Sequence, residues 1–550
     1  MTKQIITRET LREFSKTLEQ YRAGKRALET RILEAEDFWK LRHWRSIRPG
    51  NPGEPEPASG WLVNTILSKH SDAVNAYPEP VCLPREEGDK AEAENLSSIL
   101  PVVLEQNDFA QVWSDVWWYK LKSGTGVYGV FWDPDKLNGL GDISIEKVDI
   151  LNLFWEPGVK DIQKSPYLFH VSLVDNRELE SSYPFLKGVL GGQKPLVRQY
   201  RYDEAISTED KSAVVDVYYR KQGRLHFCKY VGEELLYATE EDPHLRDRGL
   251  YDHGRYPFVF DPLFPEEGYP GCGYGYVDLC KDPQKTVDIL NNCLLQSAVA
   301  AATPRWFVRA DGGINEQEYG DLTKKFVHVT GRLGEDSVKR IESAPLPDSC
   351  LSYMQMKISE IKEVSGNRDV NNGSSAHVTA AAAITALQEA GNGLSKDMIA
   401  SGYRAFRKVV ELAIELVRQF YDLPRQFRIL GPMGAEQFLS YSNRGLLPKG
   451  LRLPVFDIQV QVQTEAEYKK QTYNELAVQL YQMGAFDPAR AQQTLLMLGM
   501  MDFKGKNELV RRISQNAAQA GAQEALRAAA ELGHREHPFV ERARAMAQGM

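Results

Sequence analysis

The chain has 550 residues, of which 42% are hydrophobic and 26% charged, and its formal net charge is −8 at pH 7. This length allows several packed regions, and the composition is that of a folded protein rather than a disordered or fibrous one. The acidic balance argues against tight binding of DNA, because non-specific affinity comes from Lys and Arg side chains that neutralise phosphates. We therefore expect any contact with DNA to be loose or local.

Cysteine spacing and hydropathy exclude further classes of protein. The six cysteines are scattered without a CxxC pair, which indicates neither a disulfide framework nor a zinc site. No stretch approaches the roughly 18 consecutive apolar residues of a membrane span, and the first residues are too polar for a secretory signal. We expect no membrane association and a cytoplasm-like compartment.

The N-terminal region is predicted to be helical. Apolar residues recur at steps of three, four and seven over residues 10–45, which is typical of an amphipathic helix. A proline-rich run over residues 48–60 ends this helix. A second helical stretch, residues 91–122, carries Trp113, Trp117 and Trp118, which we interpret as core side chains because large aromatic residues dominate core burial.

Residues 126–260 change to short β-like runs separated by Gly, Asp, Asn and Pro turns. We therefore predict an antiparallel sheet and an α+β fold. Glu240, Glu241 and Asp242 form an acidic turn in this region. Consecutive carboxylates do not converge on one ion without a defined loop, so we interpret them as a solvated turn rather than a metal site.

The next region is predicted to contain two helices that bracket a small β-rich segment. Gly271, Gly273 and Gly275 lack the third glycine of a dinucleotide fingerprint at the required step and the preceding strand, so nucleotide binding is not favoured. Asp282 is a candidate helix cap and Pro283 suits a first turn, which predicts a helix over residues 282–303. A β-rich segment follows, and a second helix covers residues 349–366.

The remainder of the chain is predicted to be mostly helical. Polar and glycine residues from 366 to 378 indicate a loop. A long helix then runs from residue 380 to 421, with a kink favoured at Gly391 and Gly393. Short β-like returns follow, and residues beyond 464 have a helical composition.

Motifs of catalysis are missing from the sequence. There is no GxxxxGK[ST] phosphate loop, no HExxH helix and no GxSxG nucleophile elbow. His534 and His537 lack an evident third ligand for a metal. We therefore expect no enzymatic activity, no cofactor and no metal, and a nuclease or ATPase is the least favoured alternative.

The order of several segments resembles the portal protein family of tailed bacteriophages over roughly residues 20–465. The N-terminal segment is DFWKLRHWRSIRPG, and YKLKSGTGVYGVFWDP with GDISIEKVDILNLFWEPGVKDIQKSPYLFHV follows. RYPFVFDPLFPEEGYPGCGYGYVDLCKDPQKTVDILNN resembles the approach to the family's first stem helix, with Gln284 and Asn291 or Asn292 at the expected places. VSGNRDVNNGSSAHVTAAAAITALQEAG resembles the channel loop that leads into the long kinked helix. Each segment alone is weakly specific, whereas the four together in this order are more so.

The resemblance implies a division of the chain into named regions. These are a wing (1–270), the first stem helix with its lead-in (271–303), a clip (304–348), the second stem helix (349–366), a channel loop (367–379), the kinked helix with a return to the wing (380–465) and a helical crown (466–550). The crown rests on position alone, because no signature of the family is recognised there.

The resemblance also implies a function. In this family about twelve copies form a ring at one vertex of the capsid, and double-stranded DNA passes through the channel during packaging and ejection. The expected partners are other copies of the chain, the terminase large subunit, the major capsid protein or scaffold, and a head–tail adaptor. The expected location is the virion, and the host cytoplasm during assembly. The alternative is another virion structural protein, such as a neck adaptor or minor head protein.

The resemblance places two sets of candidate site residues. The channel loop would present to DNA Asn367, Arg368, Asp369, Asn371 and Asn372. The clip would dock its partners through Trp306, Phe307, Lys324 and Lys325.

Overall fold

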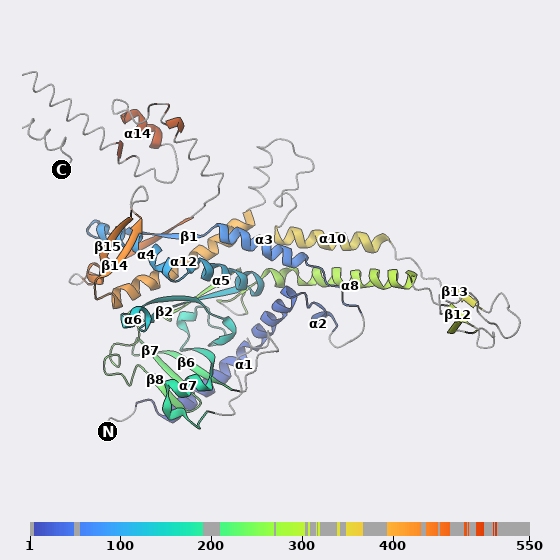
Figure 1. Ribbon diagram of the computed structural model, residues 1–550, viewed down its shortest axis with the longest axis horizontal. Coiled ribbons are helices and arrows are strands. Elements are labelled where there is room, and N and C mark those ends of the chain that lie inside the picture. Colours follow the sequence, from blue (N-terminus) through green and yellow to red (C-terminus); the bar gives the residue numbers. More distant parts are fainter. Residues whose placement is uncertain are drawn as a thin grey trace, which may run out of the picture. The chain divides into compact units, whose positions relative to one another are not determined.

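The computed structural model (Figure 1) describes residues 5–48, 55–190, 210–268, 271–302, 306–308, 315, 317–318, 338–340, 348–366, 393–430, 436–448 and 452–462, with 478–480, 482, 484, 491–499, 510 and 512–513 further on. The chain divides into two compact units, residues 1–463 and 464–550. Helices and strands are both present, so the predicted α+β class is confirmed. Among the described residues, no helix combines the length and the apolar character needed to cross a bilayer.

The first helix, α1 (Arg8–Trp39), begins at Thr7, whose side chain accepts a hydrogen bond from the Thr10 amide. Its apolar side chains occur at helical spacing on one side and are buried, as predicted. The predicted helix over residues 10–45 is wrong at its C-terminal end. Leu41 takes a left-handed backbone with a φ of 56°, and a separate short helix, α2 (Trp44–Ile47), follows.

A five-stranded antiparallel sheet packs against α1, and each strand pairs with the next in sequence. Alternate side chains of its longest strand, from Ala213 to Tyr219, lie in one apolar cluster with those of α1. The sheet therefore confirms the predicted antiparallel pairing. Its strands are β4 (Leu153–Trp155), β5 (Tyr167–Asp175), β6 (Lys211–Lys221), β7 (Arg224–Val231) and β8 (Glu234–Ala238).

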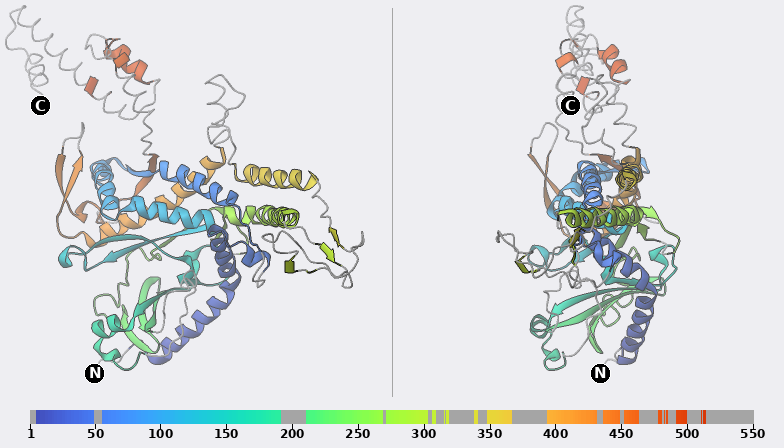
Figure 2. Two further views of the ribbon diagram at one scale, coloured as in Figure 1. Left: turned by 45° about the vertical axis from the view of Figure 1, so that its right-hand side comes forward. Right: turned by 90° about the vertical axis from the view of Figure 1, so that its right-hand side faces the viewer.

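The largest apolar core lies among four helices and a three-stranded sheet, visible beside each other in Figures 1 and 2. Trp113 and Trp117 are fully buried in this core, as predicted, whereas Trp118 is only partly buried. The helices are α3 (Trp61–Asn75), α4 (Lys90–Gln106), α5 (Phe109–Ser123) and α12 (Gly393–Phe420). The sheet has the order β3 (Asp142–Lys147), β2 (Thr125–Asp133), β9 (Phe258–Pro262).

The helix predicted over residues 91–122 is two helices, α4 and α5. Asp108 between them has a left-handed φ of 47°. The Asn107 side-chain oxygen accepts a hydrogen bond from the Ile145 amide at 3.1 Å. A hydrogen bond to strand β3 therefore stabilises the chain where α4 ends and α5 begins. The helical spacing of apolar residues could not predict this break.

Strand β1 (Pro78–Pro84) pairs antiparallel with β16 (Phe456–Val462), so segments far apart in the sequence of this unit are joined. A hairpin of β14 (Arg425–Leu430) and β15 (Glu436–Tyr441) precedes β16. The short pair β10 (Phe264–Pro265) and β11 (Gly273–Tyr274) leads into the next helix. Smaller helical elements are α6 (Lys136–Gly139), α7 (Asn176–Ser182) and the turns η1 (Glu87–Asp89), η2 (Ile150–Asn152), η3 (Ile162–Lys164), η4 (Pro184–Leu186) and η7 (Asn443–Gly445).

Helices α8 (Tyr276–Ala302) and α10 (Asp348–Ser365) lie side by side in every view. We call them the helix pair, and we call the elements α1–β11 and α12–β16 the body. Helix α8 begins six residues before the predicted start, because the Asp278 carboxylate accepts a hydrogen bond from the Gly275 amide and caps the helix there. The prediction that Asp282 caps this helix is therefore wrong, whereas α10 has nearly the predicted bounds.

Between the two helices, β12 (Trp306–Val308) pairs antiparallel with β13 (Val338–Arg340), in agreement with the predicted β-rich segment. The predicted kink of the long helix lies outside the described residues, which resume with α12. In the second unit, α14 (Ala491–Gly499) is helical, as the composition predicts.

Gly402 on α12 provides a test of this packing. A Cβ atom there would lie 2.6 Å from the Trp117 ring and 3.1 Å from the Trp113 ring. Because both rings are fully buried, we expect Gly402→Ala to lower the free energy of unfolding by about 1–3 kcal/mol. Urea unfolding followed by tryptophan fluorescence measures this change. Gly88→Ala is the matched control, since its new Cβ would meet nothing closer than 3.8 Å, and equal stability of the two variants would contradict the packing.

Candidate functional site

The helix pair exposes an unusual amount of apolar surface. Residues 293–302 of α8 include no charged side chain. Leu295 is 38% and Val299 50% exposed, and on α10 the exposed fractions of Leu351 and Met356 are 45% and 54%. Apolar surface gathered on one element of a folded protein is typical of an interaction site. The pair is therefore the first part of the candidate site.

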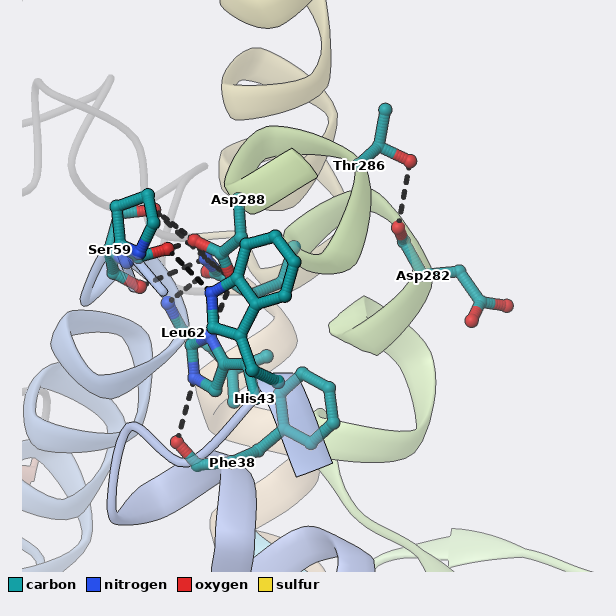
Figure 3. Close-up of polar contacts among 10 residues, drawn as sticks. Phe38, His43, Ser59, Leu62, Asp282, Thr286 and Asp288 are labelled. Carbon is teal, nitrogen blue, oxygen red and sulfur yellow. Dashed lines mark hydrogen bonds and ion pairs between the residues drawn. The ribbon is translucent and has the colours of Figure 1, made fainter. Parts of the chain in front are cut away.

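The second part is a buried polar cluster that joins α8 to the N-terminal region, shown in Figure 3. His43 and Asp288 are both fully buried, and His43 Nδ1 lies 2.5 Å from Asp288 Oδ2. His43 Nε2 lies 3.0 Å from the Phe38 carbonyl oxygen, and the imidazole stacks on the Phe38 ring. Both ring nitrogens face oxygen atoms that can accept a hydrogen bond. The cluster therefore joins α8 to the N-terminal region through polar contacts in the protein interior.

The other oxygen of Asp288 binds the chain that follows the proline-rich run. Asp288 Oδ1 accepts hydrogen bonds from the Ser59 amide at 2.9 Å and the Ser59 hydroxyl at 2.8 Å. Gln284, one turn earlier on α8, donates to the Ser59 carbonyl at 2.9 Å and accepts from the Leu62 amide at 3.2 Å. The N-cap of α3 is Gly60, which has no side chain to accept that amide, so α8 supplies the cap. Two consecutive turns of α8 therefore hold residues 59–62.

An ion-pair cluster beside it joins α1 to α8. Glu34 accepts from Lys281 at 2.8 Å and from Lys285 at 3.0 Å, and the Ser46 hydroxyl donates to it at 3.0 Å. Partial burial acts to raise the pKa of Glu34, but the hydrogen bonds from the two lysines and Ser46 outweigh it and lower that pKa to about 2. Glu34 is therefore ionised at neutral pH.

Two buried lysines hold the N-terminal half of α12. Lys69 on α3 donates to the Ser395 hydroxyl at 2.9 Å, and that hydroxyl donates to Asp72 at 2.8 Å. Lys120 on α5 donates at 2.7 Å both to Ser401 and to Asp261. Burial lowers the pKa of both lysines, since it disfavours the charged form. These contacts hold α12 against α3 and α5.

The sequence-predicted site residues lie mostly outside the described residues. This holds for Lys324 and Lys325 and for the whole set Asn367, Arg368, Asp369, Asn371 and Asn372. Trp306 and Phe307 lie in β12, opposite Arg340 and Lys339 of β13. The channel-loop set and the two lysines therefore stay predictions, and of the clip set only Trp306 and Phe307 are placed, in β12.

The acidic turn differs from its prediction. Glu240 is only 5% exposed and accepts a hydrogen bond from the Tyr219 hydroxyl, and Glu241 accepts from the Ile5 and Ile6 amides. The interpretation as a fully solvated turn is wrong, because the N-terminus and β6 cover it. No group of three or more His, Cys, Asp or Glu side chains that could hold a metal ion occurs within the described part of the chain.

Sequence reasoning missed most of the polar cluster. Gln284 was singled out through the family resemblance, but His43, Ser59 and Asp288 were not. One signal was present: Asp288 lies next to Val287 on the buried side of α8, where an apolar residue is the usual choice. A charged residue at such a position indicates a buried partner, although its identity requires the structure.

Comparison with known families gives one match. The family described as Phage P22-like portal protein matches residues 70–549. The match begins within α3, so α1, α2 and the polar contacts made by residues 34–62 precede it. A search of curated proteins finds no match for the chain.

The Glu34 cluster makes stability depend on pH. The pKa of Glu34 falls from 4.5 to about 2 on folding, so its contribution is present above pH 4.5 and is lost as the pH falls toward 2. We expect Glu34→Gln to lower the free energy of unfolding by on the order of 1–2 kcal/mol at pH 7, allowing for the partial exposure of this side chain. The decrease should become progressively smaller toward pH 3.

Chemical unfolding at pH 7, 4 and 3 measures this dependence. Glu19→Gln is the control, because Glu19 lies on the same helix and is 59% exposed in a pair with Arg22. If Glu34→Gln lowers the free energy of unfolding by the same amount at all three pH values, the lowered pKa of Glu34 is contradicted.

Proposed function

Because this chain belongs to the P22-like phage portal protein family, we propose that its copies form a ring at one capsid vertex and that double-stranded DNA passes through the ring during packaging and ejection. The family consists of structural proteins, not enzymes. The single observation that carries the proposal is the exposed apolar surface of the helix pair, including residues 293–302 of α8, which carry no charge. Such a surface fits a wall built from several copies, and the match favours a portal over a neck adaptor or minor head protein.

The length and charge of α8 suit a channel wall. Its 27 residues span about 40 Å at 1.5 Å per residue. DNA carries one negative charge per ~1.7 Å of its axis, so a surface rich in Lys and Arg would retain the duplex. On α10, Lys357 donates to Glu360 at 2.7 Å, which reduces its attraction for phosphates. A wall of this kind allows DNA to slide.

The apolar side chains of the pair suit contacts between copies. Leu295 and Val299 are one helical turn apart on α8, and residues 298–302 are all alanine or valine. Small side chains permit close approach of a neighbouring helix, and burial of apolar area gives roughly 25 cal/mol per Å². Contacts between two different surfaces of each copy close into a ring when the rotation permits. We propose about twelve copies for this ring, as the family resemblance implies.

The remaining regions complete the proposal. The clip docks the terminase large subunit and later a head–tail adaptor, with Trp306, Phe307, Lys324 and Lys325 at the contact. The wing contacts the major capsid protein or scaffold, and the crown belongs to residues 466–550. The channel loop touches DNA through Asn367, Arg368, Asp369, Asn371 and Asn372. Asparagine amides make weak, exchangeable hydrogen bonds to phosphates, which suits sliding.

The first test of the proposal concerns the ring. Light scattering after size exclusion is expected to find closed rings of the purified chain and a shift to monomers for Leu295→Glu with Val299→Glu, since a buried unpaired charge opposes assembly. Leu137→Glu, at a 58% exposed position of the body, is the control and should leave rings intact. A wild-type chain that stays monomeric at high concentration would refute the proposal.

The second test concerns the channel loop. Deletion of residues 369–374 is expected to leave rings intact but to reduce the number of stably filled heads, because the loop lies between the two long helices at the channel. Counting filled and empty capsids in infected cells, with the wild-type gene supplied as a comparison, measures this effect. Normal numbers of filled heads from the deletion would contradict the loop assignment.

A further inference from the structure

Helix α1 bridges the five-stranded sheet and the helix pair. At its N-terminal end Arg12 makes two hydrogen bonds of 2.9 Å to Glu233 in the turn between β7 and β8. Glu241, just after β8, accepts from the Ile5 and Ile6 amides. The apolar side of α1 is buried on the sheet from Leu11 to Tyr21. This end of α1 is therefore fixed to the five-stranded sheet.

The C-terminal end of α1 and the chain that follows hold α8 at three successive turns. Lys281 and Lys285 bind Glu34, and Asp288 binds His43 and Ser59. The attachment points from Lys281 to Asp288 extend over about 10 Å of the helix axis. A helix held at points spaced along its axis resists tilting, whereas a helix held at one point can pivot.

The contacts at Asp288 are also directional. Helix α8 packs on α3 and α5 as well, but apolar packing is non-directional and tolerates small rotations. If the fully buried Asp288 carboxylate moves away, it loses its contacts with His43 Nδ1 and the Ser59 amide inside the protein, and that loss costs far more. The polar cluster in Figure 3 therefore restricts the direction of α8 more narrowly than the surrounding core does.

We propose that α1, His43 and Ser59 form a brace that sets the direction of α8 relative to the rest of the body and thereby the number of copies in the ring. This inference rests on the proposed function, because the helix pair provides the contacts between copies. Adding or removing one copy in a ring of about twelve changes the rotation between neighbours by only about 3°. The direction of α8 has to be fixed to that precision for a single number of copies to form.

The brace lies almost entirely outside the part of the chain that matches the family. The match covers residues 70–549, whereas the brace contributes Glu34, His43 and Ser59. Its partners on α8, which are Lys281, Lys285 and Asp288, fall within the matched region. The brace therefore lies in the N-terminal region that precedes the match and acts on a helix that the match includes.

The test compares two aspartates of the same helix, both drawn in Figure 3. Asp288→Asn removes the buried charge and turns an amide NH₂ toward donors, whereas Asp282→Asn changes an exposed side chain. Native mass spectrometry and electron microscopy of purified rings count the copies. We expect one predominant number for the wild type and for Asp282→Asn, and two or more numbers for Asp288→Asn.

Further variants separate the brace from general stability. Glu34→Gln acts on a side chain that is 26% exposed, so it loosens the brace without leaving a buried charge unpaired, and it should also broaden the distribution of copy numbers. Gly402→Ala destabilises the body without touching α8 and should leave the copy number unchanged. If Asp288→Asn fails to fold, the copy numbers measured for Glu34→Gln test the brace.

The outcomes distinguish the two proposals. Absence of rings for the wild type would refute the proposed function itself. Wild-type rings with the same single copy number for Asp288→Asn and Glu34→Gln would overturn the brace and leave the proposed function standing. Broadening by Gly402→Ala to the same degree would also overturn the brace, because general instability would then explain the effect.

Discussion

The structure depends on one mechanical constraint: α8 has to leave the body and still keep a fixed direction, although its outer half contacts little besides α10. Apolar packing at its base provides most of the attachment, and the core around Trp113 and Trp117 makes that base rigid. The buried pair of His43 and Asp288 adds the directional part, since each partner is costly to leave unpaired. The helix pair, with its exposed apolar side chains, is therefore held on a rigid base.

Buried charge recurs in the body for the same physical reason. Lys120 and Asp261 are both almost fully buried, and Lys120 donates hydrogen bonds to Asp261 and to Ser401 of α12. Replacing such a pair by apolar side chains often costs little or nothing, so its value lies in specifying position. Here the positions specified are those of α8, through Asp288, and of α12, through Ser401.

The sequence contains no catalytic motif, and the helix pair exposes apolar side chains. Both features are consistent with the proposed function. A conduit for DNA needs a wall with few cations and a strong contact between copies, and it needs no reactive group. In the proposed ring, the outer half of α8 would meet the first need by having no charged residue and the second by exposing Leu295 and Val299. The net charge of the chain is consistent with the same requirement.

The sequence by itself determined those features that depend on neighbours along the chain. The apolar period predicted α1 and α10, alternation predicted the antiparallel sheet, and the order of motifs indicated the family that the match later showed. Only the tertiary structure decided where α1 ends, where α4 and α5 separate, and which residue meets Asp288. Asn107 breaks a helix because Ile145 binds it, and His43 meets Asp288 across 245 residues of chain. Such contacts join residues that are far apart in the sequence. A local sequence pattern can single out each residue, but only the fold shows which residues are in contact.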